Sequence, residues 1–162
     1  MNAFTDQRNL RVGDVIQVNP QIPHSLQHGV RVVEFQTPHY ERYILSFAQK
    51  VLTQKQWDTE KALAHVQLNL EESEIKQISD TESLVADFEE FKATRIVLQP
   101  GVNKMIDADT YCLMIGVEGS VELGQQQLNP EDGYYIPACA SPVEIRNTSP
   151  EPATFLIAQP TG

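Results

Sequence analysis

The sequence predicts an all-β fold, either a small barrel or a sandwich, and two features of the chain support this. From residue 83 onward, short runs rich in apolar and β-branched residues are separated by turn pairs such as Pro100-Gly101 and Glu118-Gly119. Strands that recur at intervals of roughly 8–12 residues are typical of sandwiches and barrels. The length of 162 residues suits one domain, or one complete small unit with an appendage.

Seven strands are expected in this part of the chain. They are residues 83–88, 91–98, 110–117, 120–123, 133–136, 143–146 and 153–158. Seven strands within about 80 residues make a complete small all-β unit.

The N-terminal part of the chain predicts two further strands around a corner. Residues 12–18 are rich in β-branched side chains and are entered through the turn-forming pair Gly13-Asp14. Pro20 and Pro23 end any strand beyond this point, and the rigid corner they form carries His24. The next predicted strand is residues 30–36.

Charged side chains sit at defined positions on these strands. Because side chains alternate along a strand, Glu34 shares one face of residues 30–36 with two valines. Residues 40–47 form a third predicted strand, on which Arg42 can oppose Glu34. Either residue is equally explained as a solvent-facing member of an ion pair.

A helical connector is expected next. Asp58 or Thr59 can cap a helix from residue 60 to about residue 68, which has apolar residues at helical spacing. Residues 69–82 are acidic and lack periodicity, so we expect a solvated linker there.

Charge and hydropathy disfavour several partners. The chain has 12 Lys and Arg against 22 Asp and Glu, a formal net charge of −10, which argues against nucleic acid and anionic membranes as partners. No apolar run approaches the ~20 residues that cross a bilayer. Residues 1–11 are polar and unlike a signal peptide, so we expect a cytoplasmic protein.

The cysteines predict no cross-link. Cys112 and Cys139 lie 27 residues apart in apolar or small-residue surroundings, which supports neither a disulfide framework nor a CxxC metal site. We expect two free thiols, half or fully buried.

A weak internal repeat suggests that one β unit occurs twice. Residues 13–20 (GDVIQVNP) align with residues 131–138 (EDGYYIPA), and another predicted strand follows each copy. About 40 residues of predicted strand precede the second copy, but only twelve residues precede the first. The first copy would therefore have open sheet edges. It could dock on the complete unit, dimerise, or have been cut from a longer protein, which is the explanation we favour.

The turn and strand of residues 13–18, with the proline corner and His24, resemble the second sequence motif of cupins, the double-stranded β-helix (jelly-roll-like) barrels. The order of the following segments is similar to the C-terminal half of type I mannose-6-phosphate isomerase, in which a second, metal-free cupin unit closes the chain. The resemblance implies an incomplete cupin segment (residues 1–47), a helix-containing linker (48–82) and a complete metal-free barrel (83–162).

The resemblance also implies site residues. His24 fills the position of a zinc ligand, Glu34 that of an active-site carboxylate, and Arg42 that of an arginine near a sugar phosphate. The implied reaction is aldose–ketose isomerisation of a hexose 6-phosphate, in which a metal polarises the oxygens and a base moves a proton between neighbouring carbons.

The chain departs from this family where metal is concerned. An open catalytic zinc site needs about three protein ligands, but no H-x-H pair is present, and Pro142 occupies the position that matches His24. We therefore expect that this chain alone does not retain zinc, and that His24 can equally be a corner histidine. Asp107, Asp109 and Glu118 are better explained as exposed turn residues than as a cation site.

Two functions follow as expectations. The first is a truncated or degenerate mannose-6-phosphate isomerase-like protein with little activity alone. The alternative is a non-catalytic cupin module that binds a small sugar-like ligand or a protein partner. A homodimer that completes the open N-terminal sheet is a further expectation.

Overall fold

The computed structural model describes residues 6–38, 43–45, 59–69 and 74–161. The chain forms two compact units, residues 1–72 and residues 73–162. Among the described residues, no helix is both long enough and apolar enough to cross a membrane.

The described part of the first unit contains one helix, α1 (Thr59–His65), and a series of turns. Backbone hydrogen bonds close two of these turns, from the N–H of Asp14 to the carbonyl of Arg11 (3.1 Å) and from the N–H of Ile22 to the carbonyl of Asn19 (3.3 Å). The first turn is also closed by the Asp14 carboxylate, which accepts a hydrogen bond from the Arg11 N–H at 2.8 Å.

The strands predicted for residues 12–18 and 30–36 are wrong, because the described residues of the first unit form no strand. β-branched residues favour an extended backbone, but a strand persists only where it has a partner and an apolar face to bury. Both conditions fail here, since Val12 is fully exposed and Val32 is 46% exposed. The third predicted strand, residues 40–47, lies outside the described residues except for 43–45, which are not in a strand.

Helix α1 ends at His65, about three residues earlier than the sequence predicts. The N–H of Gln67 does not continue the helical ladder, because it donates to the carbonyl of Gln21 at 3.0 Å. The side-chain amide of Gln67 donates to that of Gln21 as well, also at 3.0 Å. A contact between distant segments therefore ends the helix.

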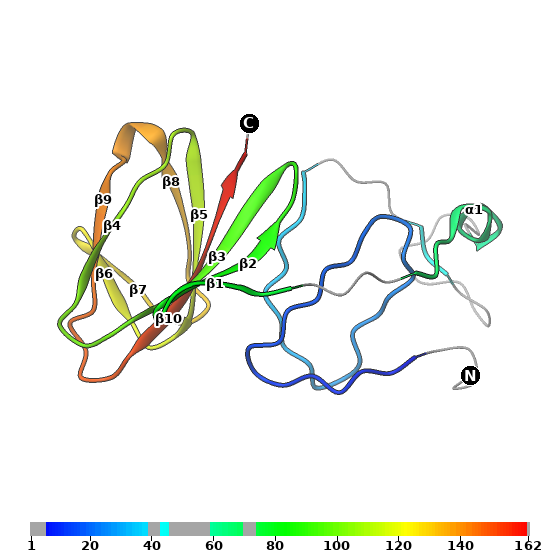
Figure 1. The fold of residues 1–162 in the computed structure, drawn as a ribbon, viewed down its shortest axis with the longest axis horizontal. Helices are drawn as coiled ribbons and strands as arrows, with labels where there is room; N and C mark the ends of the chain where they lie inside the picture. Colours follow the sequence, from blue (N-terminus) through cyan, green and yellow to red (C-terminus); the bar gives the residue numbers. More distant parts are fainter. Residues whose placement is uncertain (1–5, 39–42, 46–58, 70–73, 162) are drawn as a thin grey trace. The chain divides into compact units, whose positions relative to one another are not determined.

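The second unit consists of two antiparallel sheets. Its strands are β1 (Lys76–Ser79), β2 (Glu82–Asp87), β3 (Phe91–Leu98), β4 (Asn103–Ile106), β5 (Tyr111–Glu118), β6 (Val121–Leu123), β7 (Gln126–Leu128), β8 (Gly133–Pro137), β9 (Val143–Arg146) and β10 (Ala153–Pro160), with a 3-10 turn at Ala138–Ala140. The six-stranded sheet has the order β1-β2-β3-β10-β5-β8, and the four-stranded sheet has the order β4-β9-β6-β7. Figure 1 shows the two sheets of this unit facing each other.

The pairing of the strands reveals how this unit is wound. β6 pairs with β7, β5 with β8, β4 with β9 and β3 with β10, all antiparallel. The eight strands β3 to β10 are therefore one long hairpin, folded so that successive parts of it cross between the two sheets. This is the topology of a jelly roll, the double-sheet arrangement of cupins. The all-β prediction of a cupin-type barrel is confirmed.

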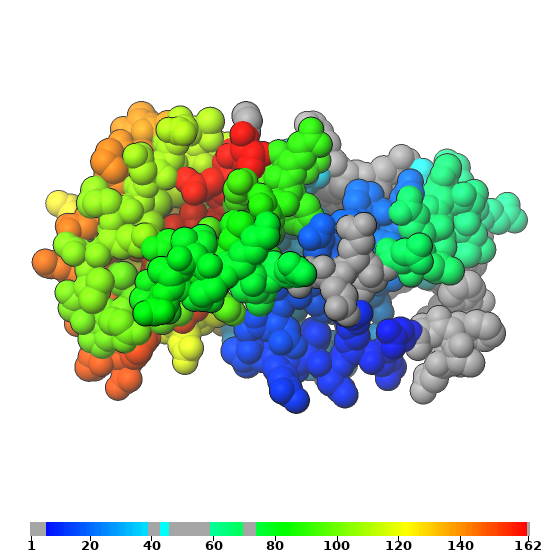
Figure 2. Space-filling model, in the orientation of Figure 1, coloured from blue at the N-terminus to red at the C-terminus, as the bar shows by residue number. Residues whose placement is uncertain are grey.

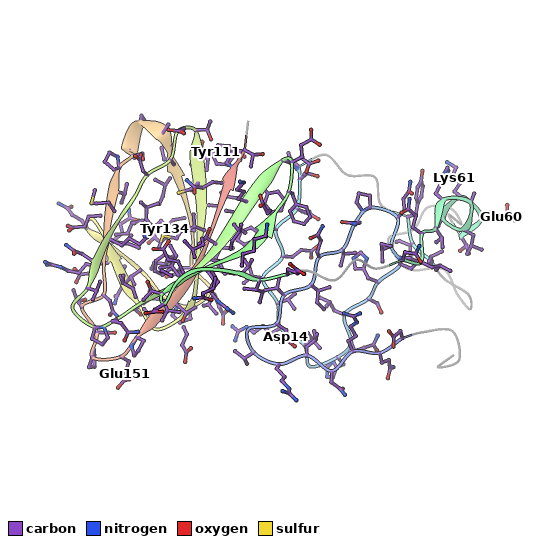
Figure 3. The ribbon with its side chains drawn as sticks, viewed as in Figure 1. Asp14, Glu60, Lys61, Tyr111, Tyr134 and Glu151 are labelled. Carbon is purple, nitrogen blue, oxygen red and sulfur yellow. The ribbon has the colours of Figure 1, made fainter. Side chains whose placement is uncertain are left out.

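The core of the second unit lies between the two sheets. Inward-facing residues of the central strands fill it, including Cys112 and Met114 on β5 and Phe155 on β10, which are at most 1% exposed. Tyr134 of β8, labelled in Figure 3, packs partly against this core, and its hydroxyl donates to the carbonyl of Gln127 on β7 at 3.1 Å. That hydrogen bond links the two sheets.

Each of the seven strands predicted from residue 83 onward is present, and its ends differ from the prediction by at most two residues. Three strands were not predicted. β4 and β7 have only four and three residues, two of them polar in each strand, and β1 falls within residues 69–82, where a linker was expected. The linker prediction is wrong for β1 because backbone pairing with β2 holds it, although its four side chains are exposed, as expected for a solvated segment.

Both cysteines are free thiols, as predicted. Cys112 is buried, but Cys139 is exposed. The prediction that both are at least half buried is therefore wrong for Cys139, which lies in the 3-10 turn after β8 rather than on the inner face of a strand.

Candidate functional site

His24, the predicted zinc ligand, lies on an exposed corner of the first unit. Its ring Nδ1 is 2.8 Å from the carbonyl oxygen of Ile22. The two prolines and Gln21, which adopts a φ of 72°, bend the chain so that the ring folds back on its own backbone. This is the arrangement of a corner histidine.

Glu34 is also exposed, in a segment without strand pairing. Arg42 lies outside the described residues, so the predicted pairing of Arg42 with Glu34 stays a prediction. In the part of the chain that the structure describes, no three His, Cys, Asp or Glu side chains gather where they could hold a metal ion. The described residues therefore do not fit a zinc site.

The segment after β4 contains Asp107 and Asp109, which were predicted, with Glu118, to be exposed turn residues rather than a cation site. Asp107, Asp109 and Glu118 are exposed, as expected for turn residues. The carboxylate Oδ1 of Asp107 accepts a hydrogen bond from the hydroxyl of Ser141 at 2.8 Å. That hydroxyl oxygen in turn accepts one from the N–H of Ala108 at 2.7 Å. These bonds tie the end of β4 to the loop before β9.

A cavity of about 190 Å³ opens beside this segment. We call it the rim cavity. Residues of β2, β3, β4 and β10 surround it, and its polar lining residues are Glu82, Thr94, Lys104, Asp107 and Gln159. Strand β2, which carries Glu82, lies with β1 on the face of the second unit that Figure 2 shows in green.

An ion pair spans the rim cavity. The Nζ of Lys104 on β4 lies 2.5 Å from Oε1 of Glu82 on β2, so the pair connects the two sheets. The side chains are 30% and 25% exposed. Partial shielding from water makes such a pair stronger than one on an open surface, and it also keeps the two side chains in place.

Gln159 fixes another side of the rim cavity. Its Nε2 donates to the backbone carbonyl of Asp107 at 2.8 Å, which joins the end of β10 to the segment after β4. The polar groups of the cavity are thus held by contacts between strands that are far apart in sequence. The arrangement can accept and donate hydrogen bonds, but it contains no histidine and no cysteine.

The sequence gives no signal for this cavity. Glu82 and Lys104 are 22 residues apart and Asp107 and Gln159 are 52 apart. Taken singly, none of these residues belongs to a recognisable sequence motif. Only the winding of the long hairpin brings them together, so no local motif could have identified them.

No known family model matches the chain, and no curated protein matches it. Similar solved structures include the Cupin_2 domain of an XRE family transcriptional regulator from Enterobacter cloacae, with 22% identity and a TM-score of 0.39, covering 43% of this chain and 79% of that one. A sugar phosphate isomerase of the cupin superfamily from Silicibacter pomeroyi DSS-3 has 22% identity and a TM-score of 0.39, covering 49% of this chain and 59% of that one.

The polyketide cyclase RemF from Streptomyces resistomycificus has 15% identity and a TM-score of 0.46, covering 56% of this chain and 75% of that one. These three proteins differ in the activities that their names state. It is the strand order β3-β10-β5-β8 against β4-β9-β6-β7 that gives this chain the jelly-roll fold of the cupin type.

Proposed function

We propose that this chain is a mannose-6-phosphate isomerase-like protein that works as a binding module and has little or no isomerase activity by itself. The observation that supports this best is the filled interior of the jelly roll. Met114, Ile145 and Phe155 are at most 1% exposed, so these side chains occupy the space between the two sheets in the described part of the chain. The polar groups gather in the rim cavity instead.

The surroundings of the predicted site residues support low isomerase activity. Aldose–ketose isomerisation needs a base that moves a proton between neighbouring carbons and an electrophile that polarises the oxygens. Such groups work best in a shielded site, where electrostatic interactions are strong. His24 and Glu34 are exposed.

A zinc-dependent isomerase is the second candidate. The order of the proline corner, His24, Glu34 and Arg42 along the chain supports it, because that order is similar to the family named above.

An isomerase assay separates the two. The purified 162-residue chain is incubated with zinc and mannose 6-phosphate, and the ketose product is measured. We expect no turnover above that of zinc in buffer. Clear turnover with stoichiometric zinc that is lost in H24A and E34Q but kept in H28A, a change at a second exposed histidine outside the motif, would overturn the proposal in favour of the isomerase.

A further inference from the structure

We propose that the rim cavity binds an uncharged, polyhydroxylated molecule about as large as one sugar ring, and that it discriminates against the phosphate ester of the same molecule. This inference rests on the proposed binding role and adds the chemical class of the ligand. It follows from the hydrogen-bonding capacity, the charge and the size of the cavity.

The rim cavity is rich in hydrogen-bond acceptors. Glu82 uses Oε1 to bind Lys104, Asp107 uses Oδ1 to bind Ser141, and Gln159 uses its Nε2. Among the described residues, the other carboxylate oxygens of Glu82 and Asp107 and the amide oxygen of Gln159 have no protein hydrogen-bond donor. Hydroxyl groups are donors that can satisfy such oxygens, whereas a phosphate dianion carries only acceptors.

Donors are also present, but in smaller number. Lys104 has three N–H groups and uses one of them for Glu82. The hydroxyl of Thr94 can donate or accept. A sugar hydroxyl or ring oxygen can accept from these groups, so the cavity matches a molecule whose hydroxyls both donate and accept.

The charge of the rim cavity opposes a phosphate. Two carboxylates, Glu82 and Asp107, face one ammonium group, Lys104. The ammonium group is already neutralised by Glu82 at 2.5 Å. The chain as a whole carries a net charge of −10, which adds to the repulsion of an anion.

The size of the rim cavity suits a sugar ring. A cavity of about 190 Å³ corresponds to the volume of about six water molecules in the liquid. Ile96, Ile106 and Ile157 lie beneath it and are at most 5% exposed, so the groups that can contact a ligand are the polar side chains of the rim.

The experiment is a titration of the ¹⁵N-labelled full chain, followed by amide chemical shifts, with D-mannose and mannose 6-phosphate as the two probes. D-mannose is expected to shift the amide signals of β4, Asp107 and Gln159. Mannose 6-phosphate is expected to bind at least about tenfold more weakly. Equal or tighter binding of the phosphate, or no shift of these signals with D-mannose, would overturn the inference.

Two variants test the origin of the discrimination. E82Q removes one carboxylate and leaves Lys104 uncompensated, so it should weaken the preference for D-mannose over mannose 6-phosphate by about tenfold. D87N is the matched control, because it also removes one carboxylate from an ion pair, and Asp87, which lies 3.3 Å from Lys92, does not line the cavity. It should leave the preference between the two sugars unchanged.

A merely structural role for the ion pair predicts a different result. E82Q would then lower the melting temperature without changing the preference between the two sugars, and the inference would fall. Turnover in the isomerase assay would contradict the proposed function but not the selectivity of the rim cavity. A failure of D-mannose to bind would contradict the selectivity but not the expected lack of isomerase activity.

Discussion

Asn147 is a polar side chain buried in the second unit, with no exposed surface. Its Nδ2 donates to the carbonyls of Leu98 and Glu151, each at 2.8 Å. Its Oδ1 accepts from the N–H and the hydroxyl of Ser149 at 2.9 and 2.7 Å. One side chain thus supplies hydrogen-bond partners to the turn before β10 and to the end of β3.

We predict that N147A destabilises the protein. The buried hydrogen bond to the carbonyl of Leu98 would be lost, whereas the carbonyl of Glu151 would keep the Ser149 hydroxyl as a donor at 2.7 Å. The change should cost roughly 1–3 kcal/mol in the free energy of unfolding. Urea denaturation measures this cost. A loss below about 1 kcal/mol would show that water replaces the amide.

Asp132 provides a pH-dependent contribution to stability. The backbone N–H and the Nδ2 of Asn129 both donate to its Oδ2 at 2.9 Å. These hydrogen bonds, that of the backbone first, hold the pKa of the Asp132 carboxyl below its usual value. A depressed pKa means that the folded state favours the charged form. The stabilisation is therefore complete above the pKa that the carboxyl has in the unfolded chain, and it is lost as the pH falls through the pKa of the folded state.

We therefore predict that D132N loses less stability than the wild type as the pH falls below about 4. The measurement is the midpoint of urea denaturation at a series of pH values. Asp132 is only partly buried, so the difference should be small. Identical pH dependence in the two proteins would contradict the prediction.

The residue scale also shows what the sequence could say about the site. The resemblance pointed to His24, Glu34 and Arg42; the first two are exposed in the described residues. Glu82 and Lys104, which line the rim cavity, carried no signal. A motif can name residue types at fixed spacing, but the shielding of a side chain depends on segments far away in sequence.

At Gly116, strand β5 closely approaches the loop before β8. A Cβ added to Gly116 would lie 2.1 Å from the carbonyl oxygen of Asn129. The N–H of Gly116 donates to the carbonyl of Asp132 at 3.0 Å, and its carbonyl accepts from the N–H of Glu131 at 2.9 Å. The strand and the loop before β8 therefore pack backbone against backbone.

We predict that G116A destabilises the protein by roughly 1–3 kcal/mol, because the new methyl group must displace the loop. G133A on the neighbouring strand β8 is the control, since a Cβ there meets nothing within 4 Å. Thermal or urea unfolding of the two variants gives the comparison. Equal stability of G116A and G133A would show that the loop yields without cost.

The strands of the second unit were predictable because they are regular. β5 alternates buried and exposed residues over most of its length, and turn pairs separate most strands from the next. β4 and β7 lacked such a pattern, and β1 exists through pairing with β2 alone. For residues 12–18 and 30–36 a strand was predicted but is absent, because these segments are rich in β-branched residues but have no partner strand among the described residues.

At the scale of the whole molecule, the buried apolar side chains are divided unequally between the two units. Among the described residues, the buried apolar side chains other than Ala62 all lie in the second unit. The second unit also contains all ten described strands. Burial and backbone pairing together determine how well amides are protected from solvent.

We predict that hydrogen exchange of the full chain divides accordingly. The amides of β3, β5 and β10, which lie in the interior of the six-stranded sheet, should exchange slowest. The amides of residues 30–36, which lie in no strand, should exchange faster than these. Mass spectrometry of peptides after a series of labelling times tests this. Equal protection of residues 30–36 and β10 would contradict it.

The homodimer that was expected to complete an open N-terminal sheet belongs to this scale as well, and it stays a prediction. The described residues of the first unit contain no sheet for a partner to extend. Light scattering gives the mass of the chain in solution.

The sequence by itself determined the all-β class, the position of seven strands and the turns between them, because these depend on alternation and on turn residues that act over a few positions. The tertiary structure decided which residues share a cavity and which segments become strands at all. Backbone pairing and burial depend on partners that come from distant parts of the chain. The contact between Glu82 and Lys104 exists only because the long hairpin winds β4 past β2.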